Sequence, residues 1–218
     1  MGEEFLEPKI VSFFNFKGGQ GKTTLAVNYC RYISGCYITN EPSVSIRNVL
    51  SEAIPEEQFL IMGFNDDIST VFKTAIPRSN GRIIVDFGGY ADARLETIIK
   101  HSDVVCIPCA YEGSLDLALL AETIETCKAW NQQNCIIVLN NIENDDLHEI
   151  RETVKLFYSK TYKIAEVRRS RFVRRLLKKG ELFGEISERG ALKKPLSIVL
   201  GQLTAFFETI EASLNKED

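Results

Sequence analysis

A glycine-rich loop near the amino terminus holds the residues whose types and spacing are best suited to chemistry. The run from Lys17 to Thr24 reads Lys-Gly-Gly-Gln-Gly-Lys-Thr-Thr, and it lies between an apolar run and a helical pattern. Glycines let the backbone curl so that successive N–H groups point inward, and the start of the following helix adds about half a positive charge. A loop of this kind is suited to hold the phosphates of a nucleotide.

Each polar residue of this loop has an expected role in binding ATP with Mg²⁺. Lys22 would bridge the β- and γ-phosphates, Thr23 would place its hydroxyl on Mg²⁺, and Thr24 would reach the α-phosphate. The alternative is a glycine-rich turn with exposed lysines, but strand, glycines, Gly-Lys-Thr and helix coincide as the phosphate-binding mechanism requires. The expected nucleotide-binding residues of the loop are Gly18, Gly19, Gln20, Gly21, Lys22, Thr23 and Thr24.

A second candidate for the same site is an acid at the end of a buried strand. The apolar run Ile83–Val85 is followed by Asp86, and Gly88 and Gly89 follow shortly after. An acid in this position holds Mg²⁺, commonly through a water, and the glycines would let a loop respond to the γ-phosphate. The alternative is an acid that only caps the end of a strand.

Two departures from the general phosphate-loop pattern show which family the chain resembles. The strict pattern has glycine where this chain has Phe16, and a second lysine, Lys17, precedes the glycines. The loop and the Asp86 strand resemble those of the ParA/MinD family, whose phosphate loop is the deviant Walker A box. The resemblance implies slow, partner-stimulated ATP hydrolysis by an ATP-sandwich dimer, in which Lys17 reaches the partner's nucleotide.

Further site residues come from this resemblance. The family carries Asp-x-Asp-Pro after its second strand, where the second acid positions the attacking water, and the matching run here is Thr39-Asn40-Glu41-Pro42. Glu41 keeps the carboxylate, whereas Thr39 offers a hydroxyl that cannot act as a general base near neutrality. The match also places Asn140 near the adenine ring; the alternative is a turn asparagine at a strand end. The expected catalytic residues are Lys17, Lys22, Glu41 and Asp86.

A basic segment points to a polyanionic partner. Nine basic residues and one acid lie between Lys160 and Lys179, in a chain whose net charge is −4. Ser170 is suited to an N-cap and Gly180 to a C-terminal stop, which predicts a helix over 171–179. Its cations would repel one another unless a polyanion binds, although a solvated face is the alternative. The resemblance favours DNA binding without sequence preference, by Arg168, Arg169, Arg171, Arg174, Arg175, Lys178 and Lys179.

Two rival functions stay open. Cys106 and Cys109 form a Cys-x-x-Cys run, and some relatives of this ATPase class hold an iron–sulfur cluster between subunits. The chain could therefore be a metal-binding scaffold ATPase, although the apolar strand around Cys106 favours structural thiols. A small-molecule ligase of the dethiobiotin synthetase type is the other rival, and Lys17 and the basic segment argue against it.

The elements that must position these residues are predicted by alternating strand-like and helical patterns. Such alternation predicts a single α/β domain over 1–218, a three-layer P-loop NTPase fold with a mostly parallel central sheet flanked by helices. The expected strands are Ile10–Phe16, Cys36–Thr39, Ile83–Val85, Val104–Pro108, Ile136–Leu139 and Ile164–Val167. The expected helices are Thr23–Ser34, Asp67–Ala75, Ala91–His101, Leu115–Trp130, Asp146–Ser159, Arg171–Lys179 and Leu196–Leu214.

Location and partners complete the expectations. The amino terminus lacks the pattern of a secretory signal, and no run approaches the ~18 apolar residues of a membrane span, so we expect a cytoplasmic protein without a membrane partner. The first strand begins near Lys9, which leaves no room upstream for a helix-turn-helix. The chain is therefore most similar to short ParA-type partition ATPases. Their partners would be a second copy, nonspecific DNA of the nucleoid and a ParB-like or centromere-binding adaptor; the cargo stays open.

Overall fold

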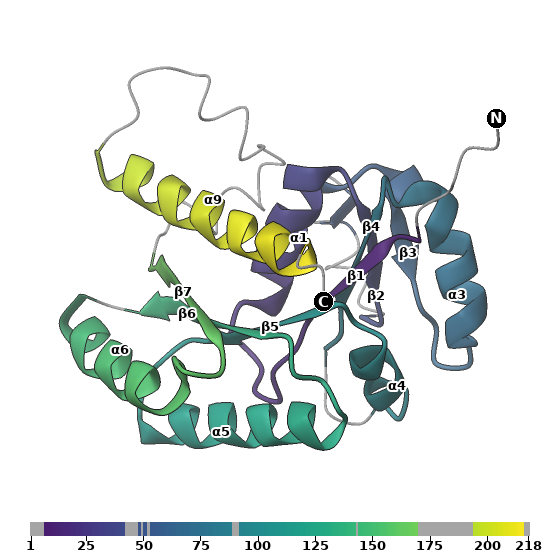
Figure 1. The fold of residues 1–218 in the computed structure, drawn as a ribbon. Coiled ribbons are helices and arrows are strands. Elements are labelled where there is room, and N and C mark those ends of the chain that lie inside the picture. Colours follow the sequence, from purple (N-terminus) through teal and green to yellow (C-terminus); the bar gives the residue numbers. More distant parts are fainter. Residues whose placement is uncertain are drawn as a thin grey trace.

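A seven-stranded sheet forms the middle layer of the protein (Figure 1), and all its strand pairs are parallel, in the order β3-β2-β4-β1-β5-β6-β7. The computed structural model describes residues 7–41, 48, 50–51, 53–88, 92–142, 144–169 and 194–215. The strands are β1 (Lys9–Phe13), β2 (Cys36–Thr39), β3 (Phe59–Ile61), β4 (Arg82–Asp86), β5 (Val104–Cys109), β6 (Cys135–Ile142) and β7 (Lys163–Arg168).

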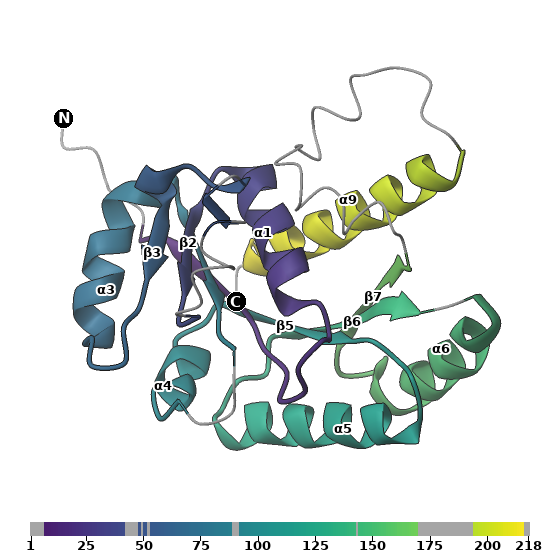
Figure 2. The same cartoon turned by 180° about the vertical axis from the view of Figure 1, so that it is seen from behind.

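Helices cover both faces of this sheet, as the two opposite views show (Figures 1 and 2). On one face, α1 (Lys22–Ile33) and α9 (Lys194–Leu214) pack into the same apolar core. The second core lies on the other face, and it is built with α3 (Ile68–Ala75), α4 (Leu95–Lys100), α5 (Ser114–Ala129) and α6 (Asn144–Tyr158). Two short 3₁₀ helices, η1 (Glu56–Gln58) and η2 (Ile76–Arg78), complete the described elements.

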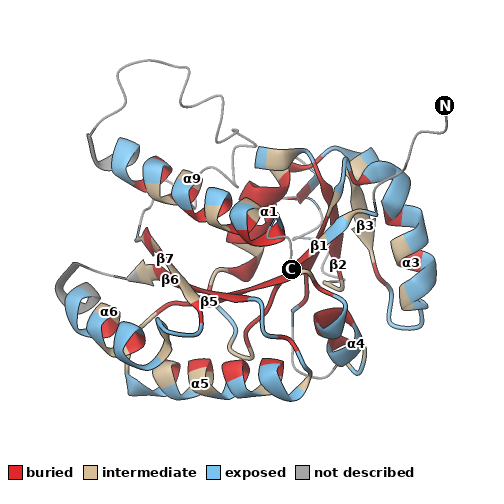
Figure 3. Ribbon diagram, viewed as in Figure 1, coloured by how far each residue is buried: buried red, intermediate tan, exposed pale blue. Residues whose placement is uncertain are grey.

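The apolar strands follow from this three-layer packing. In β4, Ile84 lies in the core under α1 and α9, whereas Ile83 and Val85 lie in the opposite core. Successive side chains of a strand point to opposite faces, so a strand covered on both sides must be apolar throughout. Figure 3 shows the central strands buried and the outer surfaces of the helices exposed.

The predicted elements match the structure, with three corrections. β3 was missed, because this three-residue edge strand is only half-buried and lacks a strong apolar pattern. The first strand ends at Phe13 rather than Phe16, because the Asn15 side chain takes over the bonding to β5. Helix α4 begins at Leu95 rather than Ala91, since Asp92 accepts from the backbone of Arg94 in a turn. The predicted three-layer fold with a mostly parallel sheet is confirmed, and every described strand pair is parallel.

The parallel topology gathers the candidate site at one edge of the sheet. The loops that follow β1, β2, β4, β5 and β6 all leave from the carboxyl ends of their strands, which is where open α/β sheets bind their ligands. β1 lies between β4 and β5, so its loop is central. In the described part of the chain, no helix is long and apolar enough to cross a membrane.

Candidate nucleotide-binding site

The glycine-rich loop joins the end of β1 to the start of α1, and its backbone requires glycine. Gly19 and Gly21 have φ angles of 76° and 89°, in the left-handed region that side chains other than glycine avoid. A Cβ atom on Gly21 would also lie 2.2 Å from Nδ2 of Asn140. Gly21 is therefore needed for both its conformation and the space that it leaves.

Three side-chain contacts fix the loop to the neighbouring strands. Asn15 Nδ2 donates to the carbonyl of Pro108 at 2.8 Å, and the backbone N–H of Ala110 donates to Oε1 of Gln20 at 2.6 Å. Asn140 Nδ2 donates to the carbonyl of Gln20 at 2.8 Å. Gln20 and Asn140 thus hold the loop on β5 and β6. The expected contact of Asn140 with adenine stays a prediction.

Replacing Gly21 with alanine is expected to weaken nucleotide binding at least about tenfold, which corresponds to about 1.4 kcal/mol. The added Cβ must push Asn140 away and release Gln20, in addition to straining the backbone. Gly81→Ala is the matched control, because Gly81 has a φ of 77° with nothing within 4 Å of the added Cβ. Strain alone costs about 1–2 kcal/mol of stability.

Urea unfolding and equilibrium binding of a fluorescent ATP analogue separate the two effects. We expect both glycine variants to lose stability and only Gly21→Ala to lose nucleotide affinity. Unchanged affinity in Gly21→Ala would contradict a phosphate site in this loop.

Lys22, the first residue of α1, is held inside the curl of the loop. Its Nζ donates to the backbone carbonyls of Asn15 and Lys17, each at 3.1 Å. The side chain is buried, and burial lowers its pKa while the charge of Asp86 opposes this shift. The ammonium is therefore positioned by loop carbonyls at the place where the phosphates are expected.

Asp86, the last residue of β4, has one carboxylate oxygen without a partner. Tyr37 donates its hydroxyl to Oδ2 at 2.6 Å, whereas Oδ1 is buried and has no hydrogen bond. Burial raises the pKa of Asp86, and contacts with Tyr37, Thr23 and Lys22 lower it. A buried oxygen without a partner is costly, so this oxygen fits a cation. Asp86 and Thr23 would hold Mg²⁺ together with nucleotide phosphates, the arrangement that Mg²⁺ favours.

Lys17 contacts an acid of its own chain. Its Nζ lies 2.5 Å from Oδ1 of Asp116 on α5, and this bond raises the pKa of Lys17. The Asp116 side chain is 2% exposed and accepts a second bond from the backbone of Glu112 at 2.8 Å. Asp116 is a site residue that the sequence did not reveal, because it lies 99 positions from Lys17. The role of Lys17 in a partner subunit stays a prediction.

Glu41 lies beside Gly88, which follows β4. A Cβ atom on Gly88 would lie 3.5 Å from Oε2 of Glu41, and the charge of Glu41 raises the pKa of Asp86. Thr39, which replaces an acid, is buried, and its hydroxyl accepts from the backbone N–H of Glu41 at 3.2 Å. Thr39 therefore supports the backbone at Glu41.

Asn40 is a second residue that sequence reasoning passed over. Its Oδ1 accepts from the backbone of Gly88 at 2.9 Å, and its Nδ2 donates to the Gly88 carbonyl at 3.2 Å. Nδ2 also donates to Asp92 at 3.1 Å, and Asp92 forms an ion pair with Arg94 at 2.7 Å. Arg94 lowers the pKa of Asp92 to about 2. Asn40 thus ties the loop after β2 to the loop after β4.

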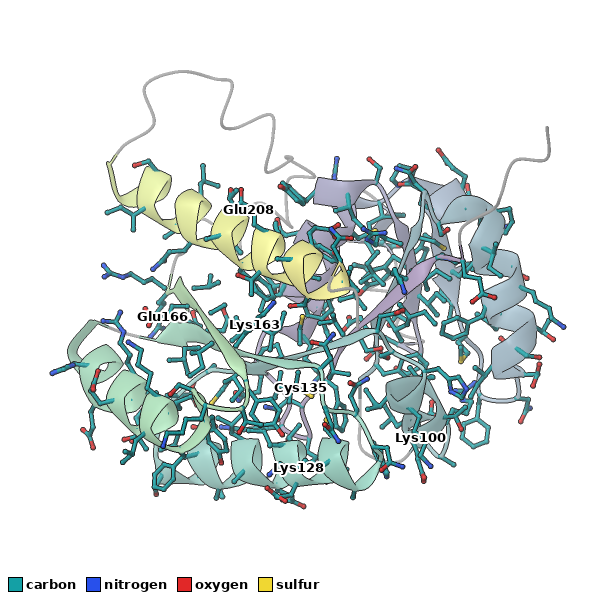
Figure 4. All side chains as sticks on the ribbon, in the orientation of Figure 1. Lys100, Lys128, Cys135, Lys163, Glu166 and Glu208 are labelled. Atoms are coloured by element: carbon teal, nitrogen blue, oxygen red, sulfur yellow. The ribbon has the colours of Figure 1, made fainter. Side chains whose placement is uncertain are left out.

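The basic segment, from Lys160 to Lys179, includes strand β7. The backbone N–H of Arg168 donates to Oε1 of Gln202 on α9 at 3.1 Å, and Arg169 is exposed. Lys163 and Glu166 lie on the same strand (Figure 4). The predicted helix 171–179 lies outside the described residues, with the remaining expected DNA contacts Arg171, Arg174, Arg175, Lys178 and Lys179. DNA binding by this segment therefore stays a prediction.

Cys106 and Cys109 lie on opposite faces of the sheet. Both thiols are buried, Cys106 in the core under α1 and α9 and Cys109 in the core on the other face. Burial raises the pKa of Cys109 to about 12, so its thiolate form is disfavoured. Within the described ranges, no group of three or more His, Cys, Asp or Glu side chains could hold a metal ion. Because the sheet separates the two thiols, they cannot bind the same ion. The alternative of a metal-binding scaffold that uses Cys106 and Cys109 is therefore wrong.

Comparison with solved structures identifies the fold. No protein-family profile matches the chain, and no curated protein matches it. MinD of Aquifex aeolicus, in its complex with MinC, superposes with a TM-score of 0.64 at 14% identity, over 92% of this chain and 96% of that chain. A Borrelia burgdorferi plasmid partition protein bound to AMPPNP gives 0.66 at 16% identity, over 94% and 100%. A Cyanothece McdA variant in complex with ATP gives 0.63 at 15% identity, over 97% and 98%.

The chain has the fold of the ParA/MinD ATPases. This fold agrees with the resemblance of the sequence to that family. The structure also explains the position of Phe16, which replaces the glycine of the general loop pattern. The Phe16 ring packs edge-on against Phe14, with 5.1 Å between ring centroids, and Phe14 lies 5.9 Å from Trp130. In this ParA/MinD fold, Phe16 anchors the beginning of the loop on the second core.

Proposed function

We propose that this chain is a ParA-type ATPase. It would bind ATP with Mg²⁺, form an ATP-sandwich dimer, bind DNA without sequence preference, and hydrolyse ATP slowly until a ParB-like or centromere-binding adaptor stimulates it. Its role would be to segregate or position a cargo such as a plasmid, on the nucleoid of the cytoplasm. The proposal joins the family resemblance of the sequence to the geometry of the candidate site.

The observation that carries this proposal is that Lys22 and Asp86 are both buried in one site, where the charge of Asp86 acts on the pKa of Lys22. Lys22 contributes a buried ammonium at the start of α1, and Asp86 contributes a buried carboxylate oxygen without a hydrogen-bond partner. The Lys22 ammonium is suited to bind the phosphates of ATP, and the free Asp86 oxygen is suited to bind the accompanying Mg²⁺. The proposal is also supported by two solved structures of this fold that contain AMPPNP and ATP.

The residues of the site divide the proposed work. Lys22 and the loop N–H groups bind the phosphates, and Asp86 and Thr23 hold Mg²⁺, which would neutralise charge that develops on the phosphates. Glu41 lies beside Gly88, where a carboxylate would orient the attacking water. Asn40 holds Gly88 and Asp92 in place, so a change at the γ-phosphate would be passed to the loop that contains both.

Measurements of DNA affinity test the proposal that ATP-dependent dimerisation increases binding to DNA. A two-fold dimer presents two copies of the basic segment, so its DNA affinity should exceed that of the monomer. We expect duplex DNA to bind more tightly with a slowly hydrolysed ATP analogue than with ADP, regardless of sequence. Contacts to phosphates should weaken with log salt at a slope of about −0.9 per neutralised phosphate.

Arg174 and Arg175 provide the variant for this measurement. Replacing both with alanine should flatten the salt slope by roughly one per lost contact and leave ATP binding intact. The control removes Lys100 and Lys128, two exposed lysines on α4 and α5 that pair with neighbouring acids (Figure 4). Fluorescence anisotropy at several salt concentrations measures the DNA affinity of the arginine variant and of the lysine control. Equal DNA affinity with ADP and with the ATP analogue would contradict nucleotide-controlled DNA binding. An unaltered salt slope in the arginine variant would mean that these arginines only face solvent.

A further inference from the structure

Tyr37 is hydrogen-bonded to Asp86, the carboxylate that we propose to hold Mg²⁺. It lies in the middle of β2, its side chain is 0% exposed, and its hydroxyl donates to Oδ2 of Asp86 at 2.6 Å. β2 and β4 are parallel neighbours in which Tyr37 pairs with Ile84 and Thr39 pairs with Asp86. The tyrosine ring therefore runs diagonally along the sheet from one register position to the next.

Packing fixes the direction of this ring. Phe59 on β3 stacks on Tyr37 with 5.9 Å between ring centroids and an angle of 21° between the ring planes. Tyr37 also belongs to the core under α1 and α9. A tyrosine hydroxyl is protonated near neutral pH, so it donates this bond and the Asp86 carboxylate accepts it. The hydrogen bond therefore has one direction and one geometry.

This bond makes the two carboxylate oxygens of Asp86 different from each other. Oδ2 accepts from Tyr37, while Oδ1 is buried and has no hydrogen-bond partner. Without this bond, the Asp86 carboxylate would keep its contact with Thr23 but would be less restrained about its terminal torsion, which is broad and roughly two-fold. Partners that orient a metal-binding group in this way commonly change metal affinity 10–100-fold when they are removed.

We propose that Tyr37 is a positioning residue that orients Asp86 so that Oδ1 is presented to the magnesium ion of the bound nucleotide. The proposal rests on the proposed function, because it requires that the site bind Mg·ATP. Tyr37 touches neither nucleotide nor ion in this account and acts only through Asp86. The opposing view is that the tyrosine hydroxyl only satisfies its own need for a buried partner.

The substitution Tyr37→Phe separates these views, because it removes one oxygen atom and keeps the ring between Phe59 and the core. The measured quantity is the factor by which Mg²⁺ strengthens binding of a slowly hydrolysed fluorescent ATP analogue, taken from dissociation constants in Mg²⁺ and in EDTA. We expect this factor to fall about tenfold in Tyr37→Phe. Affinity in EDTA should stay unchanged, since the phosphate contacts of Lys22 and the loop remain.

Tyr29→Phe is the matched control. Tyr29 is also 0% exposed in the same core, but its hydroxyl donates to Glu211 on α9 rather than to Asp86. Its loss should leave the Mg²⁺ factor unchanged, and urea unfolding of both variants shows that each is folded. Mn²⁺ binding followed by electron paramagnetic resonance gives a second measure of the ion, since oxygen ligands also suit Mn²⁺.

Each result decides between the two views. An unchanged Mg²⁺ factor in Tyr37→Phe would overturn the positioning role, and so would an equal loss of affinity in Mg²⁺ and in EDTA, which indicates a general disturbance of the pocket. The same fall in Tyr29→Phe would also overturn it. If the unmodified protein binds no analogue, the proposed function itself fails, and this is recognised before any variant is measured.

Discussion

ATP binding is expected to be lost when Lys22 is replaced by alanine. The change removes the ammonium that two loop carbonyls hold at the start of α1. Bonds from a charged donor contribute about 1.5–3 kcal/mol each, and Lys22 would serve both the β- and γ-phosphates, so affinity should fall at least a hundredfold, or roughly 2.7 kcal/mol. Equilibrium binding of ATP with Mg²⁺ measures the loss.

The control for this variant is Lys100→Ala, an exposed lysine on α4 in an ion pair with Glu96 (Figure 4). It removes the same charge far from the phosphate loop, and its ATP affinity should equal that of the unmodified protein. Urea unfolding of Lys22→Ala is measured in parallel, because burial disfavours its ammonium and its loss therefore need not unfold the chain. Unchanged ATP binding in Lys22→Ala would mean that the nucleotide site lies elsewhere.

The second large effect concerns assembly. If Lys17 reaches the nucleotide of a second copy, Lys17→Ala should still bind the ATP analogue but should remain a monomer. Light scattering coupled to size-exclusion chromatography, with a slowly hydrolysed analogue, distinguishes the two species. The Lys17 side chain is 29% exposed and is held by a single acid, so an exchange of partners requires only the break of that bond.

Asp116→Asn provides the opposite change at the same contact. It keeps Lys17 and removes the charge that holds it within its own chain, so ATP-dependent dimerisation should be retained or strengthened. Lys17→Ala instead leaves the buried Asp116 carboxylate without its cation, which is expected to lower stability. A normal ATP-dependent dimer in Lys17→Ala would remove the role that the family resemblance assigns to this lysine.

Local patterns in the sequence were enough to predict most of the fold. The second strand, Cys36–Thr39, was predicted with its observed bounds, and the other central strands were predicted to within a few residues. Such strands are apolar throughout because helices cover both faces, so their signal lies in consecutive residues. The errors fell where that signal is weak, at the half-buried edge strand Phe59–Ile61 and at the turn before Leu95.

Part of the candidate site could likewise be predicted from local sequence patterns. The sequence by itself determined the phosphate loop, because a curled backbone, a lysine and the start of a helix are encoded in neighbouring positions, as Lys17–Thr24 shows. It also determined that Asp86 ends a buried strand. These features depend on residue types at fixed short spacings, and they need no knowledge of which strands become neighbours.

Only the tertiary structure decided the partners of these residues. Asn140 holds the carbonyl of Gln20, Asp116 holds Lys17, and Tyr37 holds Asp86, and these pairs are separated by 120, 99 and 49 positions. Such contacts depend on the strand order, which places β2 beside β4 and places β5 between β1 and β6. Many strand orders are compatible with one alternating pattern, so the chemistry of each residue was local, whereas the group that orients it was set by the packing of the whole sheet.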